Sequence, residues 1–138
     1  MNWFTWALLS AIFAAITGNL AKVGVKEIDS SLATALRTCV VFILVWGAAF
    51  VKNTTPISSI SQRTWIFLIL SGLATGASWL CYFQALKIGD VSQVAPIDKL
   101  SVVFAIAIAG VFLGEQITWM HGIGTALIVC GSILVARA

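Results

Sequence analysis

The sequence predicts an all-α, polytopic membrane protein, a bundle of five transmembrane helices that forms a single domain over residues 1–138. Of its residues, 60% are hydrophobic and only 9% are charged, whereas about a quarter of the residues of a soluble protein are charged. The apolar residues gather in five runs, each close to the ~20 residues that a helix needs to cross a bilayer core of ~30 Å. The runs are continuous and do not alternate with polar residues, so a transmembrane β-barrel is excluded.

The five spans cover about residues 3–20, 32–51, 65–86, 91–113 and 118–136. The first follows an N-terminus without a basic region or a small-residue cleavage site, so we expect a retained span rather than a signal peptide. Asp29, Ser30 and Ser31 precede the second span, and each is a candidate N-cap for it. The third span follows the longest loop, residues 52–64. Short connections at 89–90 and 114–116 predict that the third, fourth and fifth spans are antiparallel neighbours.

The distribution of positive charge predicts the orientation of the chain. An odd number of spans places the termini on opposite sides of the membrane, and we call the side of the N-terminus side A and the other side B. The basic residues of the connections are Lys22, Lys26, Lys87 and Arg137 on side B, against Lys52 and Arg63 on side A. Because cytoplasmic loops carry the positive excess, we expect side B and the C-terminus to face the cytoplasm, with the protein in the inner membrane. The excess is small, so insertion in one orientation or in both stays open.

Most of the tryptophan residues map near side A, where they are typical of an interfacial aromatic belt: Trp3, Trp6, Trp46, Trp65 and Trp119. Trp79 and Tyr82 lie in the third span towards side B. We expect these two side chains, rather than those of the belt, to line a cavity.

Charged residues inside the spans indicate where function resides. Ionisable groups in the hydrocarbon layer are costly and usually face a cavity or a partner within the bundle. Arg37 in the second span and Asp98 in the fourth both lie about 10 Å from side B at 1.5 Å per residue. Equal depth allows them to pair. Such a pair either fixes the register of two helices or lines a transport path, and the second interpretation is favoured.

Pro96 and Lys99 flank this aspartate. Pro96 either sits harmlessly in the first turns of its helix, where its missing N–H matters least, or kinks the helix and exposes backbone carbonyls. Lys99 either extends back to the side B head groups or faces the same cavity as Asp98.

The sequence excludes several other function classes. It has no serine elbow, histidine cluster or phosphate-binding glycine loop, so we expect no enzyme, no cofactor and no ATP-driven pump. The three cysteines match no metal site and are expected to be buried filler. The net charge of +3 is scattered and predicts no nucleic-acid binding. Glu115 is interpreted as a solvated loop carboxylate, and His121 as a lone interfacial residue.

Three segments together resemble the EamA-type branch of the drug/metabolite transporter superfamily, as a single five-helix unit. They are WLCYFQALKIGDVSQVAPIDKLSVVFAI over 79–106, FLGE over 112–115 and GIGTALIVCGSILVA over 122–136. In that family two five-helix units of opposite orientation move small organic solutes. The resemblance implies pairing with a second, antiparallel copy or a related five-helix subunit, in agreement with inverted repeats that place a solute site at their interface.

The resemblance leads to a functional hypothesis. We expect a secondary transporter or exporter of small organic metabolites that acts as a dimer of five-helix units. Along its path, Arg37, Asp98 and Lys99 would line or gate the cavity, Trp79, Tyr82 and Gln84 would contact solute, and Pro96 would loosen the helix. The alternative is a non-transporting membrane subunit that stabilises or regulates another complex. Related four-helix multidrug transporters carry a carboxylate in their first helix. The first span here has none, which leaves Asp98 as the deep carboxylate for ion coupling.

Overall fold

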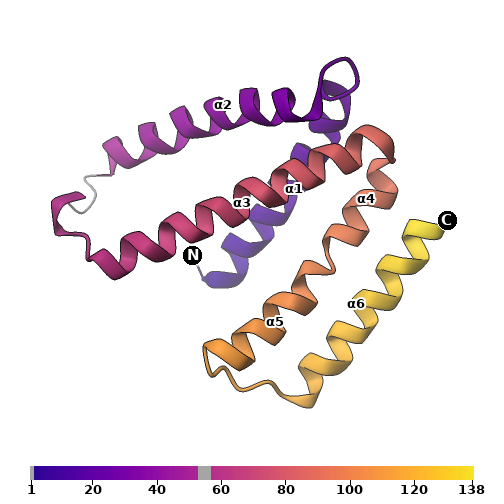
Figure 1. Ribbon diagram of the computed structural model, residues 1–138. Coiled ribbons are helices and arrows are strands. Elements are labelled where there is room, and N and C mark those ends of the chain that lie inside the picture. Colours follow the sequence, from indigo (N-terminus) through magenta and orange to yellow (C-terminus); the bar gives the residue numbers. More distant parts are fainter. Residues whose placement is uncertain (1, 53–56) are drawn as a thin grey trace. The chain divides into compact units, whose positions relative to one another are not determined.

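The computed structural model describes residues 2–52 and 57–138, and in these ranges the chain is built from helices. In chain order they are α1 (Trp3–Gly24), α2 (Ser30–Val51), the single 3₁₀ turn η1 (Ile57–Ser59), α3 (Gln62–Ile88), α4 (Val91–Asp98), α5 (Ser101–Phe112) and α6 (Trp119–Arg137) (Figure 1). Five segments are long and apolar enough to cross a membrane, namely α1, α2, α3, Val91–Phe112 and α6. The all-α, polytopic membrane fold is therefore confirmed.

The helices extend past the predicted spans where polar residues continue the helical hydrogen bonding. The third helix begins at Gln62 rather than near Trp65, and the second begins at Ser30 because Asp29 caps it. The Asp29 backbone is extended, and its Oδ2 accepts a hydrogen bond from the Ser31 N–H at 3.0 Å. Capping satisfies a donor that the first helical turn leaves free.

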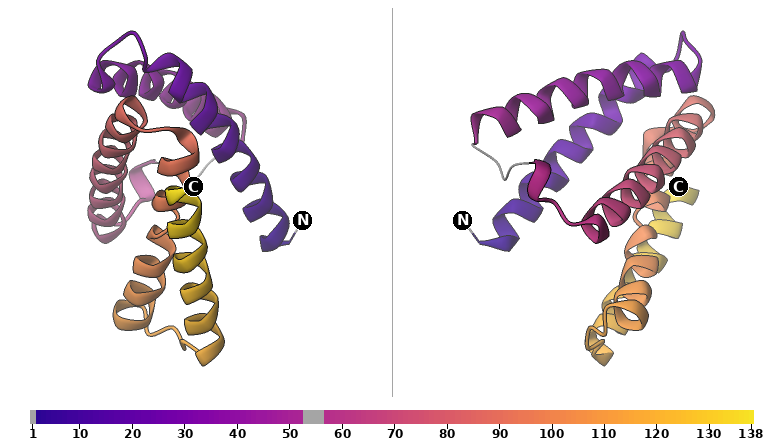
Figure 2. Two further views of the ribbon diagram at one scale, coloured as in Figure 1. Left: turned by 90° about the vertical axis from the view of Figure 1, so that its right-hand side faces the viewer. Right: turned by 60° about the vertical axis from the view of Figure 1, so that its left-hand side comes forward.

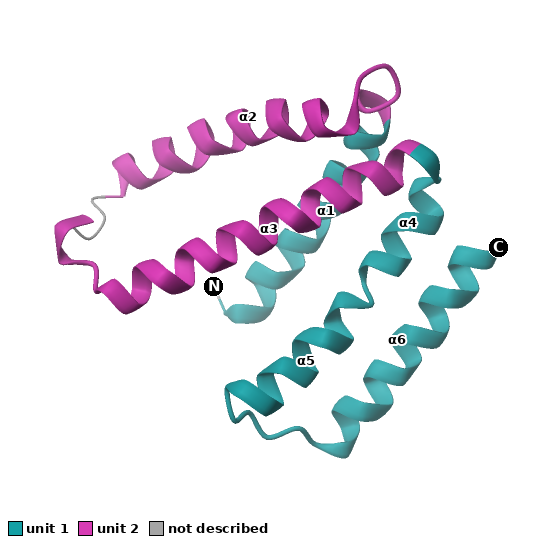
Figure 3. Ribbon diagram, viewed as in Figure 1, with its two compact units in different colours: residues 1–22, 88–138 teal, residues 23–87 magenta. Residues whose placement is uncertain are grey.

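Two compact units can be distinguished along the chain, residues 1–22 with 88–138 as unit 1 and residues 23–87 as unit 2 (Figure 3). The grouping of all five spans into one domain stays a prediction. Each unit is described by itself below.

Unit 2 contains α2 and α3, which are joined by polar contacts near their side B ends. The Ser30 hydroxyl donates to Gln84 Oε1 at 2.5 Å, and the Lys87 ammonium donates to the Ile28 carbonyl at 3.0 Å. Val25 and Leu86 are fully buried nearby. The register of the two helices is thereby set at the end where α2 begins and α3 ends.

Unit 1 contains the hairpin of α5 and α6, with α4 leading into it. Helix α6 packs along both α4 and α5, and the two views of Figure 2 show the three helices side by side. At the end of α5, the Ala109 carbonyl accepts hydrogen bonds from the N–H groups of Leu113 at 3.0 Å and Glu115 at 3.2 Å. This closure requires Gly114, whose φ of 67° is the left-handed conformation that glycine adopts at helix ends.

The predicted fourth span is one transmembrane segment but two helices. Helix α4 ends at Asp98, and α5 begins at Ser101. Across the break, the N–H groups of Lys99 and Leu100 donate to carbonyls three residues earlier, Pro96 at 3.1 Å and Ile97 at 3.0 Å. The chain is therefore wound more tightly here than an α-helix, whose bonds reach four residues back. Pro96 lacks the N–H that would bond to the Ser92 carbonyl and lies inside α4, two residues before its end; that it loosens the helix stays a prediction.

Candidate functional site

Arg37 is held between α2 and α3 by aromatic rings. Its guanidinium carbon lies 4.3 Å from the ring centroid of Trp79 and 5.6 Å from that of Phe83. Trp79 and Phe83 are four residues apart and therefore share one face of α3. A cation within about 6 Å of an aromatic centroid is attracted by the electron-rich ring face. The half-buried arginine thus lies on an aromatic surface formed by α3.

A short polar row on α2 leads to this arginine. Ser30 and Thr34 are buried, and with Arg37 they follow the spacing of residues that share a helix face. The Thr34 hydroxyl donates to the Ser30 carbonyl at 2.8 Å, while the Ser30 hydroxyl donates to Gln84 on α3. We call the set formed by Ser30, Thr34, Arg37, Trp79, Phe83 and Gln84 the arginine cluster.

Sequence reasoning identified half of the arginine cluster. It named Arg37, Trp79 and Gln84 but not Phe83, Ser30 or Thr34. The Trp79-x-x-x-Phe83 and Ser30-x-x-x-Thr34-x-x-Arg37 spacings were the available signals. Tyr82, also predicted, is half-buried on α3 beside Phe83.

The remaining predicted site residues lie in unit 1 at the break between α4 and α5. Lys99 Nζ lies 3.3 Å from Asp98 Oδ2, and the Asp98 side chain is 38% exposed. Pro96 is half-buried two residues before Asp98. Since Arg37 belongs to unit 2, its pairing with Asp98 stays a prediction, as does the convergence of the seven predicted residues on one path.

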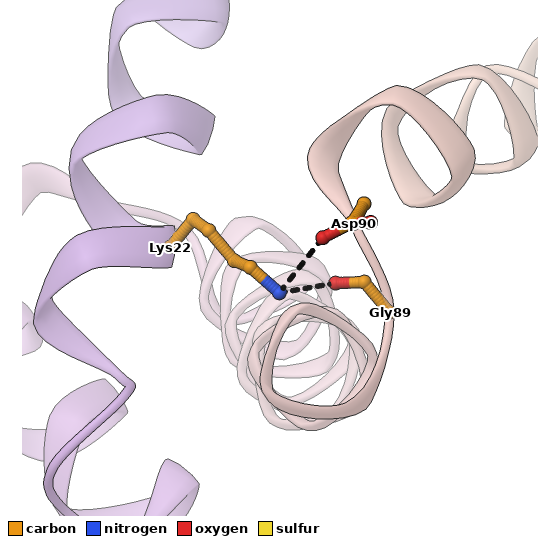
Figure 4. Close-up of polar contacts among 3 residues, drawn as sticks. All are labelled: Lys22, Gly89 and Asp90. Atoms are coloured by element: carbon orange, nitrogen blue, oxygen red, sulfur yellow. Dashed lines mark hydrogen bonds and ion pairs between the residues drawn. The ribbon is translucent and has the colours of Figure 1, made fainter.

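A second ion pair, which sequence reasoning missed, joins α1 to the turn before α4. The Lys22 ammonium donates to the Gly89 carbonyl at 2.6 Å and lies 3.6 Å from Asp90 Oδ1 (Figure 4). The Lys22 side chain is only 21% exposed. From the sequence, Lys22 was counted only as a positive charge of side B. Within unit 1, its contacts also hold the end of α1 against the turn before α4.

An open cavity of about 250 Å³ lies at the side A end of unit 1. It is lined by Ala105, Ile106, Ala109, Glu115, Gln116, Ile117 and His121. His121 Nδ1 accepts a hydrogen bond from the Thr118 backbone N–H at 3.1 Å, so this histidine caps α6. Within residues 2–52 and 57–138, His, Cys, Asp and Glu side chains form no group of three that could hold a metal ion.

Comparison with known proteins places the five spanning segments in a transporter family. Residues 1–137 match the model of the EamA-like transporter family. The chain is similar to an uncharacterized transporter in the cobO 3' region of Sinorhizobium sp.. The two are 51% identical over an alignment of 138 residues that covers 98% of this chain and 96% of the relative. It is 34% identical over 96 residues, 70% of this chain and 90% of the relative, to the probable 4-amino-4-deoxy-L-arabinose-phosphoundecaprenol flippase subunit ArnE of Enterobacter sp. (strain 638).

No solved structure matches the chain. The family match extends over nearly every residue, including the arginine cluster and the break between α4 and α5. It confirms the resemblance found in the sequence and the assignment as a multi-pass membrane protein of a transporter family. The chain belongs to the EamA-like transporter family.

Proposed function

We propose that the protein is a secondary transporter or exporter that moves small organic metabolites across the inner membrane as a dimer of five-helix units. The observation that carries this proposal is the interrupted fourth span, which ends α4 at a charged residue pair inside a transmembrane segment. Secondary transporters commonly build solute and coupling-ion sites from discontinuous helices, where helix ends and unwound backbone contact the ligand.

The two charges at the break are opposite and adjacent. Asp98 is the last residue of α4 and Lys99 follows it, at the point where the backbone hydrogen bonds reach three residues back. In the proposed mechanism Asp98 binds the coupling proton or cation. When the proton or cation binds, Lys99 leaves Asp98 and pairs with another group. In the same proposal, solute is contacted by Trp79, Tyr82, Gln84 and Arg37.

One observation supports assembly from two five-helix units. The ArnE relative is named as a flippase subunit. The partner is a second copy or a related five-helix protein in the opposite orientation, and the C-terminus of this chain faces the cytoplasm.

The test replaces Asp98. The purified protein is reconstituted in proteoliposomes, and a panel of radiolabelled amino acids and small amines identifies a solute that the wild type accumulates. Asp98→Asn is expected to lower the initial rate by at least about a hundredfold, because the amide keeps the shape but cannot take up a proton or balance a cation.

Asp90→Asn is the matched control. Asp90 is 79% exposed at a turn, and we expect its variant to transport at close to the wild-type rate. The protein must remain inserted and dimeric in both variants. Wild-type transport by Asp98→Asn would remove this residue from the coupling role.

The second candidate function is a non-transporting subunit, favoured by the word subunit in the name of the ArnE relative. Chemical crosslinking in native membranes separates the two. A dimer of this chain or of two five-helix proteins supports transport, and a stoichiometric partner of another kind supports the accessory role.

A further inference from the structure

We propose that Arg37 binds an oxyanion, a carboxylate or phosphate group, on the solute or lipid that occupies the arginine cluster. The proposal concerns the chemistry of the ligand and rests on the proposed function only in assuming that the cluster faces the transport path.

The arginine is placed inside a transmembrane segment. It lies seven residues beyond the start of α2 at Ser30, about 10 Å along the helix axis. Its guanidinium is closer to Trp79 than to Phe83, and Trp79 lies one turn farther from the end of α3. The charge is therefore held between two helices instead of being extended to the membrane surface.

The contacts of Arg37 use its charge but not its hydrogen-bond donors. Among the described residues of unit 2, its interactions are the two with aromatic rings, and no hydrogen bond or ion pair of the guanidinium occurs there. A guanidinium carries five N–H donors in its own plane and binds carboxylate or phosphate with two parallel hydrogen bonds. These donors are suited to an acceptor that enters the cluster.

The acidic residues of the chain have other positions or partners. Unit 2 contains only Glu27 and Asp29, both before α2 begins, and Asp29 caps that helix. In unit 1, Asp90 pairs with Lys22 and Asp98 with Lys99. Glu115 follows α5 at the other end of its hairpin with α6. Within unit 2, both acidic residues therefore precede α2, and we assign the balancing of Arg37 to a negative group supplied by a ligand.

The test measures binding, so it does not depend on transport. The protein is purified in dodecyl maltoside, which contains no phosphate, and ³¹P NMR follows titration with phenyl phosphate as a free oxyanion and with phosphatidic acid as a lipid head group. Saturable binding is expected with at least one probe. It should weaken by at least about tenfold in Arg37→Gln, the loss of one charge-assisted interaction.

Arg63→Gln is the matched control because Arg63 is also stacked on a ring of α3, with its guanidinium carbon 5.9 Å from the Phe67 centroid, but lies at the opposite end of the helix. This variant should bind like the wild type. Arg37→Lys keeps the charge but not the planar guanidinium, so its affinity for the probe should lie between those of the wild type and Arg37→Gln. This variant also controls for misfolding of Arg37→Gln.

Three results would overturn the proposal. One is the absence of binding by the wild type, and another is equal loss in the Arg37 and Arg63 variants. The third is binding that appears only when Asp98→Asn is introduced, which would show that Asp98 already occupies the arginine. Failure of transport with intact Arg37-dependent binding would instead count against the proposed function alone.

Discussion

Arg37 illustrates how a single charge is accommodated in a spanning helix. Placing an arginine at the centre of such a helix costs about 2.5–3.5 kcal/mol on insertion scales, while a cation–π contact contributes about 0.5–2 kcal/mol depending on its exposure. The 4.3 Å contact with Trp79 therefore offsets only part of the cost. The remaining cost favours a negative partner for the guanidinium.

Asp29 provides a prediction at the same scale, outside the spans. The hydrogen bond from the Ser31 N–H holds the pKa of this carboxyl below its ordinary value of 3.8. Because the folded-state pKa is lowered, the ionised Asp29 stabilises the folded protein above about pH 3.8, and this contribution is lost as the pH falls through the lower folded pKa. A ¹³C NMR titration of the carboxyl in micelles should give a midpoint below 3.8.

The control removes the donor. In Ser31→Pro the backbone N–H is absent, and the midpoint for Asp29 should rise towards the ordinary value. An unchanged, low midpoint in this variant would mean that the cap is not the cause of the lowered pKa.

At the scale of elements, the connection between α5 and α6 brings the Ile117 side chain close to Gly110. A Cβ added to Gly110 would collide with the Ile117 side chain, which lies in the connection between the two helices. The small-residue pattern of the fourth span thus serves packing within the chain at this position. Such close approach is the usual role of small residues in membrane helices.

The corresponding prediction is that Gly110→Ala lowers the melting temperature of the purified protein, because Ile117 must move to admit the methyl group. Gly122→Ala, on α6, is the control, since an added Cβ there meets no other described atom within 4 Å. The double variant Gly110→Ala with Ile117→Ala should recover part of the loss. No recovery would show that the collision is not with Ile117.

At the scale of the whole molecule, orientation in the membrane decides the kind of partner. The basic residues counted on side B exceed those on side A by only a small margin. A chain that inserts in a single orientation needs a related subunit as its antiparallel partner, whereas a chain that inserts both ways can pair with itself.

Reporter fusions test this directly. We expect a C-terminal green fluorescent protein, which fluoresces only in the cytoplasm, to give signal, and a C-terminal alkaline phosphatase, active only outside, to give little. The physical reason is the positive excess of side B, and Lys26→Gln with Arg137→Gln should reduce the difference between the two reporters. Phosphatase activity without fluorescence would contradict the assigned orientation.

Much of the fold follows from local properties of the chain. The thickness of the bilayer and the length of the apolar runs predict five spanning segments, and the run Asp29-Ser30-Ser31 predicts a cap for α2, which the structure assigns to Asp29. The depth of Arg37 and Asp98 also follows, because the rise per residue of a helix is constant. None of these features requires knowledge of which helices touch.

The amino-acid sequence by itself determined that this is a five-span membrane protein of a transporter family with ionisable groups in its second and fourth spans. Tertiary structure decided that Arg37 meets Trp79 and Phe83, that Ser30 engages Gln84, and that Lys22 reaches Gly89. It also placed the end of α4 at Asp98, two residues beyond the proline. Helical periodicity specifies the direction in which each side chain points from its own helix, but its partner depends on the packing of helices distant in sequence.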